Sequence, residues 1–181
     1  MFVRTDRLLL RPGWPDDAPA LAAAIGEERI VRNLARAPWP YGIDDARAFL
    51  SRPATALPNL LIFLRSRRPP ELVGGIGLDA TPEGEVELGY WIASAHWNRG
   101  FVTEAGHAAL AVARHGLRLR RLIAGHYGDN PASGRVLEKL GFEATDEGSR
   151  HSAARREPAV SRSYALDLCE PVVRREECIV A

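Results

Sequence analysis

A chain of 181 residues, with 24 Lys and Arg against 23 Asp and Glu, has the length of one compact domain and a formal net charge of +1. Its hydrophobic fraction of 46% and charged fraction of 26% are those of a globular protein, which excludes a disordered or collagen-like chain. The near-zero charge also excludes a dedicated nucleic-acid binder, whose basic surplus would neutralise phosphates.

The cysteines and the apolar runs favour a cytoplasmic protein. Cys169 and Cys178 stand in the last stretch of the chain, where a disulfide would close little more than a tail. No segment approaches the ~18 apolar residues of a membrane span, and the run at 8–10 is too short for the core of a signal peptide. The last four residues fit a prenylation pattern, but so short a pattern arises easily by chance. We therefore expect no contact with a membrane.

Hydrophobic spacing and turn residues predict an alternation of short strands and helices. In chain order they indicate a strand over 5–11, helices over 18–25 and 44–50, strands over 60–64, 72–78 and 85–92, a helix over 103–115, a strand over 122–124, a helix that starts at 129–133 and ends at Gly141, and strands near 142–145 and over 161–168. Turns are expected at 67–70 and 81–84. About seven strands and about four helices predict an α+β domain.

The strand over 85–92 alternates most clearly. Its apolar side consists of Val86, Leu88, Tyr90 and Ile92, and its other side of Glu85, Glu87 and Trp91. The two glutamates either mark a solvated face or place a carboxylate beside a cleft. Before this strand, the stretch 75–80 formally fits a dinucleotide-binding glycine pattern. That pattern should be followed by a helix, but here a turn at 81–84 and another strand follow, so we reject this interpretation.

The segment after this strand is typical of an anion-binding loop. A loop that enters a helix N-terminus presents unpaired backbone N–H groups and the positive end of the helix dipole. Gly100 would let the backbone approach an anion without an intervening side chain, and Arg99 adds positive charge. An ordinary helix start has much the same composition, so the loop alone does not identify a ligand.

Three separated segments, in this order, resemble the GCN5-related N-acetyltransferases (GNAT), and in particular their ribosomal-protein N-terminal acetyltransferase (RimJ/RimL-like) branch. They are ELGYWI at 87–92, WNRGFVTEA at 97–105 and NPASGRVLEKLGF at 130–142, and TDRLLLR at 5–11 is similar to the first strand of that branch. The resemblance implies an N-acetyltransferase domain over 1–170, followed by a C-terminal tail over 171–181. It also implies a mostly antiparallel sheet, splayed at its centre, that holds acetyl-coenzyme A as cosubstrate.

The resemblance implies the coenzyme contacts by position. The pyrophosphate would lie on the backbone of Asn98, Arg99, Gly100, Phe101, Val102 and Thr103, the pantetheine arm beside Trp91, Ile92 and Ala93, and the next helix would meet the coenzyme through Asn130 and Ser133. The chain departs from the family at Trp97 and Val102, where the family's loop usually has Gln or Arg and Gly or Ala. It also has Leu137 where many members use a tyrosine on the leaving thiolate, so that role would pass to Ser133, whose other reading is a helix-capping residue.

The implied reaction is direct attack of a primary amine on acetyl-coenzyme A in a ternary complex. Free α-amino and lysine ε-amino groups have pKa values of ~8 and ~10.4, so a base must take a proton at pH 7. Glu87 is the candidate base and an acceptor-binding residue, and the N–H of Ile92 is the candidate oxyanion partner by analogy with the family. His96 could assist from its place before the loop and His126 lies near the expected cleft, but such histidines are more often structural or surface residues. No metal site is expected.

The sequence does not identify the amine acceptor. Trp39 and Tyr41, in a loop over 38–42, either bind the acceptor or cover the core beneath them. A protein N-terminal α-amine is the first choice and a small-molecule amine the second, while a homodimer is neither indicated nor excluded. The alternative function is a catalytically weak module that binds acetyl-coenzyme A as a sensor, and coenzyme binding without turnover would favour it.

Overall fold

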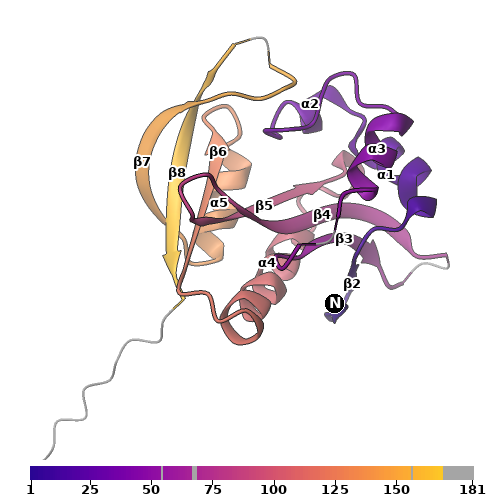
Figure 1. Ribbon diagram of the computed structural model, residues 1–181, viewed down its shortest axis with the longest axis horizontal. Coiled ribbons are helices and arrows are strands. Elements are labelled where there is room, and N and C mark those ends of the chain that lie inside the picture. The colour runs from indigo at the N-terminus through magenta and orange to yellow at the C-terminus, as the bar shows by residue number, and fades with distance from the viewer. Residues whose placement is uncertain (54, 67–68, 156, 169–181) are drawn as a thin grey trace, which may run out of the picture.

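The computed structural model describes residues 1–53, 55–66, 69–155 and 157–168, and one twisted sheet forms its centre (Figure 1). Within these ranges eight strands lie side by side in the order β1-β2-β3-β4-β5-β6-β8-β7. Their bounds are β1 Val3–Arg4, β2 Leu8–Arg11, β3 Asn59–Leu64, β4 Glu71–Ala80, β5 Val86–Ile92, β6 Arg121–Tyr127, β7 Glu143–Arg150 and β8 Ala159–Asp167. The tail expected over 171–181, both cysteines and residues 67–68 of one expected turn lie outside the described residues.

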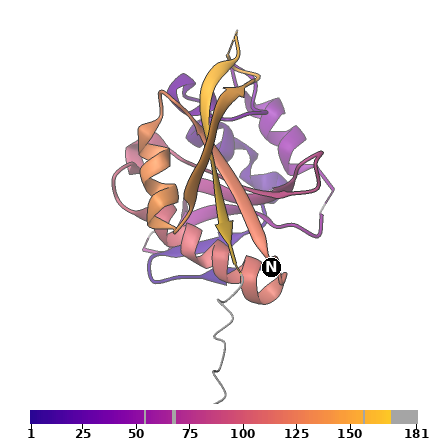
Figure 2. The same ribbon diagram turned by 90° about the vertical axis from the view of Figure 1, so that its left-hand side faces the viewer.

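The sheet is antiparallel except at its centre, where β5 and β6 run parallel. These two strands pair at a single position, Glu87 with Ile123, and then diverge. Figure 2 faces β7 and β8 and shows the strands of the second half running steeply across those of the first. The expected mixed, mostly antiparallel sheet with a central splay is therefore confirmed.

Five α-helices, counted over the described residues, cover both faces of the sheet: α1 Ala18–Ile25, α2 Glu28–Val31, α3 Ile43–Leu50, α4 Phe101–Ala111 and α5 Pro131–Lys139. Side chains point alternately to the two faces of the sheet along β3, so the contacts of successive residues show which helices cover each face. Leu60 and Ile62 belong to the buried cluster that includes Phe101 of α4 and residues of α5. Leu61 instead packs with Leu21 of α1 and with α3.

Several expected elements differ from the structure at their ends. The strand expected over 122–124 is longer, Arg121–Tyr127, and the strand expected near 142–145 extends to Arg150. The strand expected over 5–11 begins only at Leu8, because Thr5 to Leu8 form a turn in which the Thr5 N–H donates to the Leu8 carbonyl and the Leu8 N–H to Thr5 Oγ1, both at 3.0 Å. The helix expected over 103–115 starts earlier, at Phe101, and after Ala111 continues as a π-helical turn to Gly116. The four-residue helix α2 was not expected, because one turn is too short to show a helical period.

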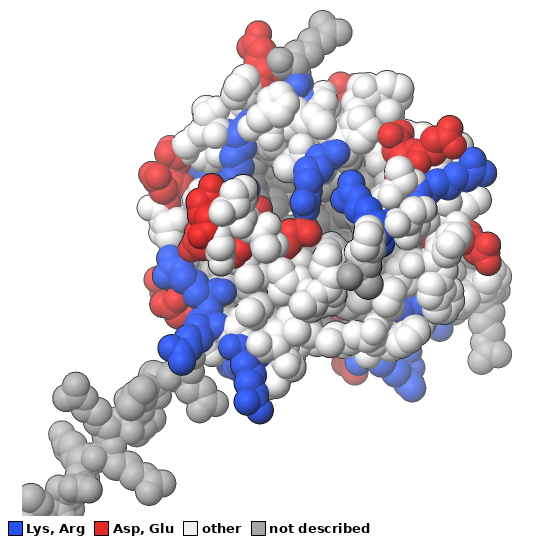
Figure 3. All heavy atoms as spheres, in the orientation of Figure 1, with Lys and Arg blue, Asp and Glu red and all other residues white. Residues whose placement is uncertain are grey.

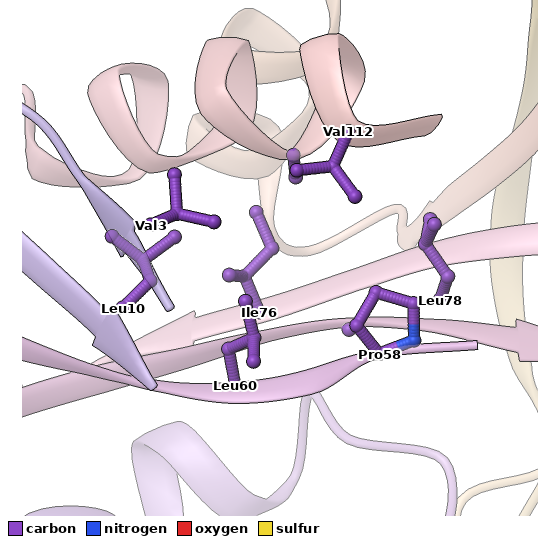
Figure 4. A pocket seen from close by; sticks show the side chains of 9 residues that line it. Val3, Leu10, Pro58, Leu60, Ile76, Leu78 and Val112 are labelled. Atoms are coloured by element: carbon purple, nitrogen blue, oxygen red, sulfur yellow. The ribbon is translucent and has the colours of Figure 1, made fainter. Parts of the chain in front are cut away.

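A small cavity lies between the sheet and the end of α4 (Figure 4). Its volume is ≈ 10 Å³, and its lining is apolar: Val3, Leu10, Pro58, Leu60, Ile76, Gly77, Leu78, Ala109 and Val112. About one water molecule would fill that volume, and no polar side chain lines it, so it is a packing gap and not a binding site.

Candidate active site

The diverging edges of β5 and β6 open into a cleft of ≈ 1120 Å³. Figure 3 shows a hollow on this face, with basic side chains beside it. Ligand sites typically enclose ~300 to 1,000 Å³, so this cleft has room for a large cofactor together with a second molecule.

The inner edge of β5 presents the backbone of Ile92 to the gap. The Ala93 N–H donates to the Val73 carbonyl of β4 at 2.9 Å, and backbone groups along a strand point alternately to its two neighbours. The N–H and carbonyl of Ile92 therefore face the β6 side. The carbonyl accepts a hydrogen bond from the Trp97 indole Nε1 at 2.8 Å, which leaves the Ile92 N–H as the backbone donor aimed into the gap.

The loop between β5 and α4 has the backbone of an anion-binding turn. Asn98 and Gly100 both adopt left-handed conformations, with φ of 59° and 74°, and the residues on either side of Gly100 do not. Alternation of this kind turns successive N–H groups toward one concave side. Gly100 is also the N-cap of α4 and contributes no side-chain cap, so the first-turn amides of Phe101, Val102 and Thr103 keep free N–H groups. These residues fit a diphosphate.

The first turn of α5 brings a serine to the same cleft. The Asn130 side chain caps the helix by accepting from the Ser133 N–H at 3.4 Å. The Ser133 hydroxyl therefore does not cap its own helix, and its Oγ lies 2.8 Å from the Tyr90 hydroxyl, which also lies 2.9 Å from the Ser133 carbonyl. Burial raises the pKa of Tyr90 to about 12, so the phenol stays a hydrogen-bond donor at neutral pH.

Glu87 lies on the opposite face of the sheet, where the cleft continues, and is half-buried. Its Oε1 accepts from Nη1 of Arg150, at the end of β7, at 2.5 Å. No hydrogen bond of Glu87 Oε2 occurs among the described residues, so this oxygen has lone pairs available to an incoming amine. The ion pair keeps the carboxylate in place at the point where β5 and β6 begin to part.

The cleft brings most of the predicted site residues together. Those that line it are Tyr41, Glu87, Trp91, Ile92, Asn98, Arg99, Gly100, Phe101, Val102, Thr103, Asn130 and Ser133. Two lie apart from its lining: Ala93 is buried with its N–H bonded to β4, and Trp39 is exposed on the outer loop. Of the two histidines, His96 bonds Glu71 at 3.0 Å, and His126 bonds the Tyr127 carbonyl at 2.8 Å.

Tyr90 and Arg150 were missed as site residues. The alternation of the strand predicts Tyr90 on its apolar side, and the ring does pack against the core there, but alternation gives no information on the hydroxyl. Arg150 lies 63 positions after Glu87, and no local pattern marks it as a partner. Across the described residues, no group of three or more His, Cys, Asp and Glu side chains could hold a metal ion, and no helix has the length and apolar character to cross a membrane.

Comparison with known proteins now decides the family. A family model described as "Acetyltransferase (GNAT) domain" matches residues 7–143. The chain belongs to the GNAT acetyltransferases. It is accordingly an N-acetyltransferase that uses acetyl-coenzyme A as cosubstrate.

Relatives of this GNAT chain agree in sequence and in fold. The "Uncharacterized N-acetyltransferase YoaA" of Bacillus subtilis is 28% identical over 154 residues, which cover 78% of this chain and 82% of that protein. A GNAT-family acetyltransferase from Bacillus anthracis superposes with a TM-score of 0.80 and 25% identity, over 94% of this chain and 100% of that one. RimL, a ribosomal L7/L12 α-N-protein acetyltransferase solved with coenzyme A, shares the fold at a TM-score of 0.74 and 18% identity, over 92% of this chain and 98% of RimL.

Proposed function

We propose that this GNAT enzyme acetylates a primary amine by direct attack in a ternary complex, with the α-amine of a protein N-terminus as the preferred acceptor. The observation that carries the proposal is the placement of three groups around one gap. Ser133 lies on the α5 face of the sheet, Glu87 on the face of α1 and α3, and the N–H of Ile92 points into the gap between them. Such an arrangement lets coenzyme and acceptor approach from opposite faces.

The residues have separate roles in this proposal. Backbone amides at 98–103 hold the pyrophosphate, and the Ile92 N–H donates to the thioester oxygen as charge develops on it. Glu87 Oε2 takes a proton from the attacking amine, directly or through water, while Arg150 holds the other oxygen. The Ser133 hydroxyl donates a hydrogen bond to the departing sulfur, and Tyr41 lies where the acceptor would enter.

The choice of an α-amine rests on chemistry and on a structural likeness. An α-amino group has a pKa near ~8, against ~10.4 for a lysine side chain, so a far larger fraction of an α-amine is already neutral at pH 7. The size of the cleft leaves space for a chain end beside the coenzyme. RimL, named for acetylation of a protein N-terminus, has the same fold. A small-molecule amine is the second class of acceptor, and the cytoplasm is the compartment we propose.

The test is an assay of thiol release from acetyl-coenzyme A with a panel of short peptides and of small amines. We expect turnover with peptides that carry a free N-terminus and none with the same peptides blocked by an N-terminal formyl group. Mass spectrometry of a lysate incubated with the enzyme would then identify the acetylated ends. Turnover of small amines alone would contradict the acceptor class, and coenzyme binding without any turnover would contradict the reaction and favour the sensor.

The role of Glu87 has its own test. Glu87→Gln keeps the shape and one oxygen for Arg150 but removes the base, and a positioned base typically contributes ~10² to 10⁴-fold to the rate. We expect kcat/KM to fall by about that factor near pH 7, with coenzyme affinity unchanged. Arg150→Met is the comparison variant: it keeps the Glu87 carboxylate but removes the side chain that holds it, so we expect a smaller fall in kcat/KM than for Glu87→Gln. An unchanged rate of Glu87→Gln from pH 6 to 9, with chemistry limiting, would remove Glu87 from the mechanism.

A further inference from the structure

The turn that precedes β2 is joined to the start of α4 by one carboxylate and one guanidinium group. Arg7 Nε donates to Glu104 Oε2 at 2.6 Å, and Arg7 Nη1 donates to the carbonyl of Arg99 at 3.0 Å. Glu104 Oε1 accepts from the Arg7 N–H at 2.9 Å and from the Thr5 hydroxyl at 2.5 Å. Residues almost a hundred positions apart are therefore bonded at the anion-binding loop.

The same loop is held by an aromatic contact on its outer side. The Arg7 guanidinium carbon lies 4.7 Å from the centre of the Phe101 ring, and that of Arg99 lies 4.8 Å from the same centre. Arg7 Nη2 is 3.6 Å from the point that a Cβ at Gly100 would occupy. Thr5, Arg7 and Glu104 are not among the residues that line the cleft, so they grip the loop from outside.

This grip sets the direction of a backbone amide. In a trans peptide unit the carbonyl and the following N–H point in opposite directions. The Arg99 carbonyl points at Arg7, outside the cleft. The N–H of Gly100, in the same peptide plane, therefore points to the cleft side, toward the place where the pyrophosphate is proposed to lie. The left-handed conformation of Gly100 then leads directly into the free amides of the first turn of α4.

We propose that Arg7 is a positioning residue for acetyl-coenzyme A, which aims the Gly100 amide at the pyrophosphate through the Arg99 carbonyl and is itself held by Glu104. The proposal rests on the proposed role of the 98–103 backbone in coenzyme binding. It also gives Arg7 a second consequence. Glu104 stands in the first turn of α4, where an unpaired carboxylate would repel a diphosphate, and its ion pair with Arg7 offsets that charge.

Glu104 stays ionised at neutral pH. Burial alone would raise the pKa of this carboxyl, but the hydrogen bonds from the Thr5 hydroxyl and from the backbone and guanidinium of Arg7 lower it below the ordinary value. A group with a lowered pKa keeps its interactions above its unfolded pKa and loses them as the pH falls through the folded pKa. The grip on the loop is therefore complete throughout the neutral and alkaline range.

The experiment is calorimetry of coenzyme A binding to six variants of the full chain, four of which address Arg7 and its partner. Arg7→Met removes the grip, and we expect its Kd to rise about tenfold, since loss of one charge-assisted hydrogen bond and of the neutralising partner of Glu104 act together. Arg7→Lys keeps the charge but lacks the planar guanidinium that bonds both Glu104 Oε2 and the Arg99 carbonyl. Most of the loss in affinity should therefore remain. Glu104→Gln should also weaken binding, because Arg7 loses its anchor. Arg4→Met, the matched control, removes an exposed positive charge three residues away and should change Kd less than twofold.

The outcomes distinguish a failure of the role of Arg7 from a failure of the proposed coenzyme site. An unchanged Kd for Arg7→Met, or full affinity for Arg7→Lys, would overturn the positioning role; tighter binding by Glu104→Gln would show that only net charge matters. Thr103→Glu tests the loop itself, with Thr103→Gln as its isosteric reference: a glutamate suits the first turn of a helix but would repel a diphosphate. Equal affinities of that pair would refute the loop, whatever Arg7 does. Thermal unfolding without coenzyme confirms that each variant is folded.

Discussion

The hydrogen bonds between Tyr90 and Ser133 allow a prediction whose size follows from the structure. Tyr90→Phe removes the phenol oxygen without opening a cavity, because the ring keeps its place in the core. Two contacts are lost, to the Ser133 carbonyl at 2.9 Å and to its hydroxyl at 2.8 Å. At a net ~0.5 to 1.5 kcal/mol for each of the two hydrogen bonds, the free energy of unfolding should fall by about 1 to 3 kcal/mol. For a chain of this size, at ~3 °C per kcal/mol, the melting temperature should fall by about 3 to 9 °C.

The pH dependence of that difference checks its cause. The folded pKa of Tyr90 is raised to about 12, so the contribution of its hydroxyl is fully present below the unfolded pKa near ~10 and is lost as the pH rises toward 12. We expect wild type and Tyr90→Phe to differ by a constant amount from pH 7 to 9 in urea unfolding followed by circular dichroism.

A double-mutant cycle with Ser133→Ala locates the interaction. The two substitutions share one hydrogen bond, so the double variant should be more stable than the sum of the single effects predicts, by about 0.5 to 1.5 kcal/mol. Tyr127→Phe, which loses a bond to the His151 carbonyl, is the matched control and should be additive with Ser133→Ala. Additivity of Tyr90→Phe with Ser133→Ala, or equal melting temperatures of Tyr90→Phe and wild type, would refute the reasoning.

Three further changes test the fold around the site. Asn130→Ala removes the cap that accepts from the Ser133 N–H and should cost about 1 kcal/mol in thermal unfolding, most of which Asn130→Asp should retain; equal losses in both would exclude the cap as the cause. Leu78→Ala would enlarge the apolar gap beside α4 and should cost about 2 to 5 kcal/mol in urea unfolding, with a smaller loss for Leu78→Met. Burial raises the pKa of Asp17, but hydrogen bonds from Arg11 and from the backbone lower it overall, so Asp17→Asn should destabilise at pH 7 and progressively less as the pH falls below ~4; a loss independent of pH would contradict this.

Short-range patterns in the sequence predicted the elements well, because their ends depend on neighbouring residues. The bounds of α1 agree at both ends, since acidic and proline residues precede it and a glycine follows. Gly141 ends α5 as expected, with a φ of 88° that favours glycine. The turn Thr5 to Leu8 escaped prediction because its hydroxyl bond replaces strand pairing in a stretch that otherwise has the residues of a strand.

The partners within the site could not be predicted in the same way. The anion-binding loop was found because glycine and helix-start residues mark it locally. The resemblance to a family added the position of Glu87 but gave no sign that Arg150 holds it, and it gave the motif at 5–11 no role. Contacts such as Arg7 with Glu104 depend on the tertiary fold, which brings the turn before β2 to α4 although 97 positions separate the two residues.

The divergence of β5 and β6 also bears on aggregation. A sheet that parts in the middle has two additional edges with unpaired amides, and such edges can recruit strands of other chains. Here the additional edges face the cleft, and the ion pair of Glu87 with Arg150 stands at the point where they part. Charged groups that point inward at an edge disfavour association with a foreign strand. The gap between β5 and β6 thus stays open for the cosubstrate, while the charges where it begins disfavour pairing with a strand of another chain.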